Sequence, residues 1–205
     1  FKGFKEKDPV KAAAKARSLL GLDPTCPVSN ISSLLEKAGI KLYFSESTLK
    51  KYFGLSINAK NGGPAIAIRT GNDVTIERQI FTAVHELGHL LLHADSYDGI
   101  DEQPVVEDDI EEKQAHMFAT HFLMPNAAFL EEWEKEMIHP FVTRVLIIKK
   151  RFSVSYQTVL YRLKDNGMAN DTIFYYFSTE YQKKYKRDLK NHYEPEALTS
   201  SDFVY

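Results

Sequence analysis

The stretch TAVHELGHLLLH, residues 82–93, decides how the rest of the 205-residue chain is interpreted. Its apolar residues follow the spacing of one face of an α-helix. Residues four apart on a helix share a face, with Cβ atoms about 5–6 Å apart. We therefore expect His85 and His89 to bind one ion together, with Glu86 beside the open position of that ion. Two imidazoles and one further protein ligand form a catalytic zinc site, which keeps a fourth position for water.

The spacing His-Glu-x-x-His is typical of metalloproteases. A zinc ion lowers the pKa of its bound water, and the carboxylate of Glu86 is placed to accept the proton of that water. The alternative is a chance pattern on a core helix whose histidines are hydrogen-bonded. Burying two histidines and a glutamate in an apolar helix is costly unless something satisfies their polar atoms, and this favours the metal site.

A third ligand is expected from a second helix, predicted over residues 109–124 and ended by Pro125. Ala115 and Ala119 lie on its buried face, and their small side chains allow close packing against another backbone. Glu111 and Glu112 are nearly equally well placed by periodicity. Spacing does not choose between them.

A resemblance to a known family does choose. HELGH at residues 85–89, the apolar run ending in His93, EKQA at 112–115 and FLMP at 122–125 together resemble the ImmA/IrrE family of metallopeptidases. By matching position, the resemblance implies that Glu112 is the third zinc ligand and that Glu111 is not. It also places His116 where the family pattern often has asparagine. His116 is therefore a candidate for contacting the ligands or the substrate, with a partly exposed surface histidine as the alternative. His93 and His121 are expected to pack or to interact with the C-terminal end of their helix.

The order of predicted elements indicates an α+β fold. We expect a mainly helical, zincin-like metalloprotease domain with a small three-stranded sheet and a helix-turn-helix-like C-terminal helical part. Strands are predicted near residues 40–44, 52–59 and 65–70. Residues 65–69 are a candidate exposed edge that could hold an extended peptide, with a core strand as the alternative. The acidic residues 94–109 predict a solvated loop.

Three segments are expected along the chain. Residues 1–139 form the zincin-like metallopeptidase core, and residues 140–170 form a helix-turn-helix-like helical subdomain packed on it. Residues 171–205 form an appended C-terminal segment with a loose tail. Asp8, Ser29 or Asn30, Asn126 and Ser155 are predicted to cap helices.

Composition excludes few classes of function. The formal net charge of −2 argues neither for nor against a nucleic-acid partner, and no apolar run reaches the ~18 residues of a membrane span. Cys26 is the only cysteine, so no internal disulfide forms and a cytoplasmic setting fits. The chain begins at Phe1, and some members of the family carry a DNA-binding domain of their own, which could precede this residue.

The leading hypothesis is a zinc endopeptidase in which His85, His89 and Glu112 bind Zn²⁺ and Glu86 activates water. No substrate-binding residue is identified, although Tyr156 or Tyr161 is a candidate oxyanion donor. The resemblance implies a protein substrate, a phage-type helix-turn-helix repressor, whose cleavage relieves repression in stress response or mobile-element control.

Two other classes of function remain as alternatives. One is a regulatory module of the same fold that binds a partner without cutting it. The other is a DNA-binding regulator, although we expect the helices of residues 141–164 to be structural or to dock substrate. Its candidate DNA contacts are Lys149, Lys150, Arg151, Gln157 and Arg162.

Overall fold

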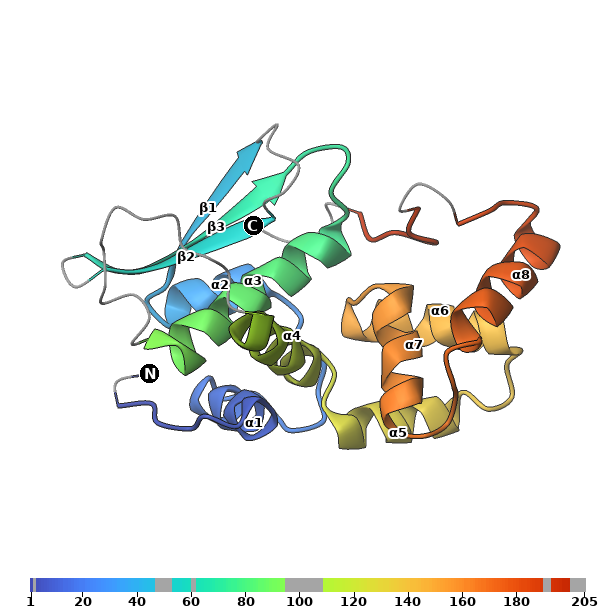
Figure 1. Cartoon of the computed structure of the whole chain (residues 1–205), viewed down its shortest axis with the longest axis horizontal. Helices are drawn as coiled ribbons and strands as arrows, with labels where there is room; N and C mark the ends of the chain where they lie inside the picture. Colours follow the sequence, from blue (N-terminus) through green and yellow to red (C-terminus); the bar gives the residue numbers. More distant parts are fainter. Residues whose placement is uncertain (2, 47–52, 60–61, 95–108, 190–192, 200–205) are drawn as a thin grey trace.

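The computed structural model describes residues 1, 3–46, 53–59, 62–94, 109–189 and 193–199. Figure 1 shows two groups of elements side by side. The first contains α1 (Pro9–Leu19), α2 (Ile31–Lys37), β1 (Lys41–Glu46), β2 (Gly54–Ala59), β3 (Gly63–Thr70), α3 (Ile76–Leu92) and α4 (Asp109–Leu123). The second contains α5 (Asn126–Lys135), α6 (Phe141–Phe152), α7 (Tyr156–Asp165) and α8 (Ile173–Tyr185). The expected mainly helical α+β fold with a small three-stranded sheet is confirmed.

The three strands are arranged in the order β1-β3-β2, with β1 parallel and β2 antiparallel to β3. β3 is therefore the central strand, and its Ile66 and Ile68 are fully buried. The prediction that residues 65–69 form an exposed edge is wrong, and the core-strand alternative is correct. β2 is an outer strand, and its Ser56 hydroxyl contacts Glu86 on α3.

α3 and α4 pack closely because small residues meet where the helices cross. A Cβ added to Gly88 would lie 3.1 Å from Phe118 Cδ1 and 3.2 Å from the Ala115 Cα atom. Glu112 lies one turn before Ala115, so this contact brings its carboxylate to α3. The close approach predicted from the alanines of this helix therefore positions a candidate ligand.

Several predicted helix caps are confirmed. Asp8, Asn30 and Ser155 each accept a hydrogen bond from a backbone N–H in the first turn of the following helix. The predicted cap at Asn126 is wrong, because Pro125 occupies the N-cap of α5. The Asn126 side-chain oxygen instead accepts a hydrogen bond from the guanidinium of Arg162 on α7.

The C-terminal segment is more ordered than expected. Residues 173–185 form helix α8, and residues 193–199 pack against the rest of the molecule rather than forming a loose tail. The fully buried ammonium of Lys149 lies 2.8 Å from Glu77 and 3.1 Å from Glu194, and it donates to the Pro195 carbonyl at 2.9 Å. This buried cluster joins α3, α6 and the C-terminal residues.

The acidic loop lies outside the described residues except at its two ends. None of the helices in the described part of the chain combines the length and apolar character that a membrane span needs.

Candidate metal centre

Three side chains from two helices converge on one point. His85 and His89 come from α3 and Glu112 from α4. The two Nε2 atoms are 3.1 Å apart, and they lie 3.2 Å and 2.9 Å from the carboxylate oxygens of Glu112. Zinc bonds of about 2.0–2.1 Å in a tetrahedron give edges of about 3.3–3.4 Å. The donor atoms therefore already have nearly the spacing that a zinc-sized ion requires.

The electrostatics also suit a cation. Burial, followed by the neighbouring His89, lowers the pKa of His85 to about 3. Burial, followed by His93, lowers the pKa of His89 to about 4. Both imidazoles are thus neutral near pH 7, the form that binds metals. Two imidazole lone pairs and a carboxylate aimed at one point make a donor set that zinc accepts.

The structure separates Glu111 from Glu112, which spacing did not. The carboxylate of Glu112 lies within 4.8 Å of ring nitrogens of both motif histidines, His85 and His89. The carboxylate of Glu111 lies within 4.8 Å of ring nitrogens of His89 and His93 instead. The position implied by the resemblance is thus the one that meets both Nε2 atoms.

Glu86 is held beside the centre by the outer strand β2. Its side chain is buried, and the Ser56 hydroxyl donates to its Oε2 at 2.7 Å. A Cβ added to Gly54 would lie 3.0 Å from Glu86 Oε1, so glycine allows the strand to approach. Ser56 and Gly54 were not predicted as functional residues from the sequence; small residues at alternate positions of the predicted strand were the available signal.

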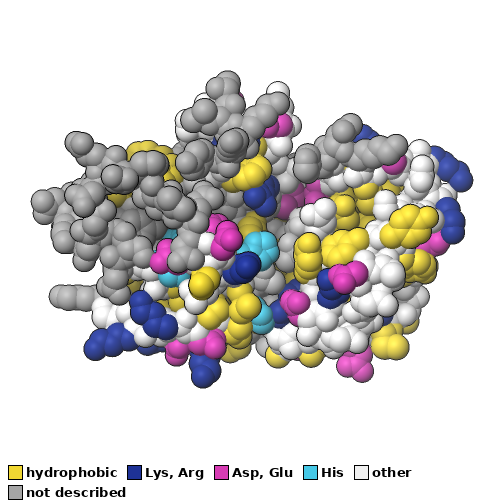
Figure 2. Space-filling view, viewed as in Figure 1, with side chains coloured by type: hydrophobic (Ala, Val, Ile, Leu, Met, Phe, Trp, Pro, Cys, Tyr) yellow, Lys and Arg dark blue, Asp and Glu magenta, His cyan; other side chains and the backbone are white. Residues whose placement is uncertain are grey.

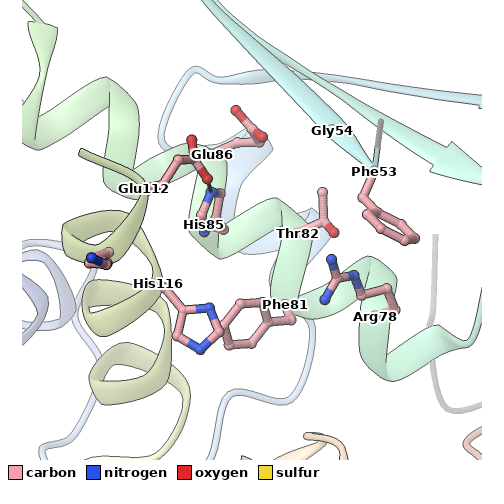
Figure 3. Close-up of a pocket in the computed structure, with 10 residues that line it drawn as sticks. Phe53, Gly54, Arg78, Phe81, Thr82, His85, Glu86, Glu112 and His116 are labelled. Carbon is pink, nitrogen blue, oxygen red and sulfur yellow. Dashed lines mark ion pairs between the residues drawn. The ribbon is translucent and has the colours of Figure 1, made fainter. Parts of the chain in front are cut away.

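A cavity of about 490 Å³ opens beside these groups. Figure 3 shows α3 along one side, with Glu112 and His116 from α4 and with Phe53 and Gly54 at the sheet. The Arg78 guanidinium lies 3.9 Å from the centre of the Phe53 ring, and His116 packs on Phe81. Histidine, acidic and basic side chains meet at the surface in the middle of the molecule (Figure 2). His116 is one of the residues that line the cavity, which is the position expected of a substrate-facing group.

Other candidate residues lie away from this cavity. Tyr156 stacks on Phe177 and Tyr161 packs on Phe174, and neither is among the residues that line the cavity, so the geometry gives no support to the oxyanion hypothesis for them. His121 contacts the buried Arg162 at 3.0 Å.

The proposed DNA contacts are largely engaged inside the protein. Lys149 and Arg162 are each only 1% exposed. Arg151 forms a 2.6 Å ion pair with Glu132. Lys150 and Gln157 are exposed, and the Gln157 amide donates a hydrogen bond of 3.4 Å to the Tyr156 hydroxyl. Two of the four basic side chains on which the DNA-binding alternative depended are therefore buried, and a third is paired with a carboxylate.

Comparisons with known proteins agree with this geometry. The profile of the IrrE N-terminal-like domain, peptidase M78, matches residues 35–164. No curated protein matches the chain. Among solved structures, a Mycobacterium tuberculosis transcriptional regulator is similar with a TM-score of 0.51 and 17% identity, over 77% of this chain and 47% of that one. This likeness concerns the fold alone, and the chain spans about half the length of that regulator.

The profile match covers more than half of the chain and includes α3 and α4, which carry all the convergent side chains. The chain therefore belongs to the IrrE N-terminal-like domain family of metallopeptidases, peptidase M78.

Proposed function

We propose that the protein is a zinc-dependent endopeptidase. His85, His89 and Glu112 hold the ion, and Glu86 is the general base. The observation that carries the proposal is the convergence of two histidine Nε2 atoms, 3.1 Å apart, on the carboxylate of Glu112, whose two oxygens lie 3.2 Å and 2.9 Å from them. Glu86, the neighbour of His85, is oriented beside them by Ser56.

The residues of the chain divide the reaction between them. Zinc bound here would polarise a peptide carbonyl and lower the pKa of an attacking water. Glu86 accepts the proton of that water and delivers it to the nitrogen of the leaving amine. The Ser56 hydroxyl fixes one oxygen of the Glu86 carboxylate, so less reorientation is needed for proton transfer.

The proposed substrate is a protein segment lying in the cavity between β2, α3 and α4. Aromatic side chains and Arg78 line this space, which offers apolar and cationic contacts to a peptide. We propose a phage-type helix-turn-helix repressor, cut in the cytoplasm so that its target genes are released in stress response or mobile-element control. Family membership supports this assignment, and the structural neighbour is named a transcriptional regulator.

Elemental analysis of the purified chain tests the metal site. We expect about one zinc per chain, a strong loss in Glu112→Gln, and retention in the matched variant Glu111→Gln. Absence of zinc from the wild-type protein after incubation with it would overturn the proposal.

Cleavage tests the assignment of Glu86. Candidate helix-turn-helix repressors are incubated with the zinc-loaded protein and the products are identified by mass spectrometry. Glu86→Gln should keep zinc and lose cleavage, because the amide cannot accept the proton of water. Cleavage by Glu86→Gln at the wild-type rate would show that another group is the base.

A further inference from the structure

A second pair of side chains lies directly behind the candidate ligand His89. The ring nitrogen of His89 that faces away from the centre, Nδ1, lies 3.1 Å from Nδ1 of His93. The other nitrogen of His93, Nε2, lies 2.9 Å from Oε1 of Gln114 on α4. His93 is only 7% exposed, so these partners replace water around its ring.

The amide oxygen of Gln114 sets the direction of both hydrogen bonds in the row formed by His89, His93 and Gln114. An amide oxygen only accepts, so Nε2 of His93 carries the hydrogen and donates to Gln114. A neutral imidazole has one N–H, and Nδ1 of His93 is therefore an acceptor. Nδ1 of His89 must then donate to it, which leaves Nε2 of His89 with its lone pair.

We propose that His93 and Gln114 are positioning residues that hold His89 in the tautomer and ring orientation required for binding the metal. The proposal rests on the metal site described under the proposed function. Partners of this kind fix the tautomer of a ligand histidine and typically change metal affinity 10–100-fold when removed. In this protein the partner of His89 is a second histidine, His93. The tautomer of His93 is set in turn by the amide of Gln114, which lies on the same helix as Glu112. The sequence suggested for His93 only packing or an interaction with the C-terminal end of its helix.

A second ion near this row is the competing arrangement. Ligand atoms of His89, His93 and Glu111 all lie within 4.8 Å of one another. An ion there would replace a hydrogen bond of His93, because both of its ring nitrogens already have partners. It would also need His89 to serve two ions, and a neutral imidazole has one lone pair for a metal. The proposal therefore predicts one ion per chain.

Two substitutions at Gln114 test the direction of the row. Gln114→Met has similar length but no acceptor, and Gln114→Glu keeps an acceptor at the same place. Met117→Leu, at an exposed position of the same helix, is the control. Long-range ¹H–¹⁵N NMR of the full chain reports the tautomers of His89 and His93 with and without zinc, and chelator competition gives the zinc dissociation constant.

In the wild-type protein we expect His93 protonated on Nε2 and, without zinc, His89 protonated on Nδ1. Gln114→Met should mix the tautomers of His93 and weaken zinc binding roughly 10–100-fold. Gln114→Glu should keep the wild-type tautomers and bind zinc at least as tightly. Met117→Leu should change neither measurement.

Three results would overturn the inference: His93 protonated on Nδ1 in the wild type, undiminished zinc affinity in Gln114→Met, or two zinc ions per chain with the second lost in Glu111→Gln. A wild-type chain that binds no zinc at all would instead refute the proposed function. Because the tautomers are measured in the wild type and in the acceptor-retaining Gln114→Glu, the test does not depend on Gln114→Met folding normally.

Discussion

Replacing Gly54 with alanine tests whether β2 must lie against α3 to keep Glu86 in place. The added Cβ would lie 2.4 Å from Thr82 Cγ2 and 3.0 Å from Glu86 Oε1. Non-bonded carbon atoms normally lie about 3.5–4.0 Å apart, so the strand or the Thr82 side chain must move by about 1.1–1.6 Å. The backbone conformation of Gly54 does not itself require glycine, so the expected effect is steric.

Overpacking of this kind costs about 1–3 kcal/mol of unfolding free energy. In a chain of this size, each 1 kcal/mol lowers Tm by about 2–4 °C, which gives a fall of roughly 2–12 °C for Gly54→Ala. Thr82→Ser removes the crowded methyl group, so the double variant should recover most of the lost stability. Crowding of the Glu86 carboxylate remains in the double variant, and a misplacement approaching 1 Å can slow a reaction about 100-fold. Stability should therefore return while cleavage stays slow.

Thermal unfolding at fixed zinc concentration and the cleavage rate on the same repressor substrate are the two measurements. Leu55→Ala is the matched control, because Leu55 is the next residue of the strand and is 55% exposed. If Gly54→Ala melts within about 1 °C of the wild type and cleaves normally, the close contact between β2 and α3 is refuted. If Thr82→Ser restores both stability and rate, the crowding of Glu86 has no catalytic consequence.

Three further changes test other parts of the structure. Ser56→Ala should leave zinc content unchanged and slow cleavage roughly 10-fold or more, because a hydrogen bond to a charged group contributes about 1.5–3 kcal/mol; steady-state kinetics measure this. Burial lowers the pKa of His85 to about 3 and that of His89 to about 4 in the folded protein. As the pH falls below 6.5, these histidines therefore take up protons in the unfolded chain before they do so in the folded chain. The metal-free protein should lose stability from pH 6.5 toward 4. Urea unfolding at several pH values checks the sign, and constant stability would contradict it. Lys149→Met leaves two buried carboxylates without their cation and should cost about 3–5 kcal/mol, with residues 193–199 becoming protease-sensitive.

Local sequence was sufficient for the features that depend on one segment. The period of the apolar residues in 82–93 predicts α3, and the i, i+4 spacing places His85 and His89 together. Helix caps such as Asp8 and Ser155 also follow from a few neighbouring residues. The third ligand was different, because periodicity alone did not decide whether Glu111 or Glu112 faces the two histidines. That choice depends on the angle at which α4 meets α3, which is set by packing between distant segments.

Features set by distant contacts were the ones that sequence analysis missed. Alternating apolar residues in 65–69 predict a strand, but strand order depends on pairing with β1 and β2, so its central place was not determined. The aromatic run at 173–177 lacks the character of a strong helix former; it becomes part of α8, where Phe177 and Tyr181 are buried in the core. The partners of His93 and Lys149 likewise come from other elements.

Three of the four proposed catalytic or ligand side chains are positioned by a contact from another element. The crossing of α3 and α4 at Gly88 brings in Glu112, Gln114 orients His89 through His93, and β2 holds Glu86. The geometry of the centre therefore exists only when α3, α4 and the sheet are packed together. Binding that requires the folded arrangement stabilises it by the same free energy, so an ion held between α3 and α4 must strengthen the packing that positions its ligands. The small residues at the crossing and the polar row behind His89 thus belong to the metal site as much as the ligands do.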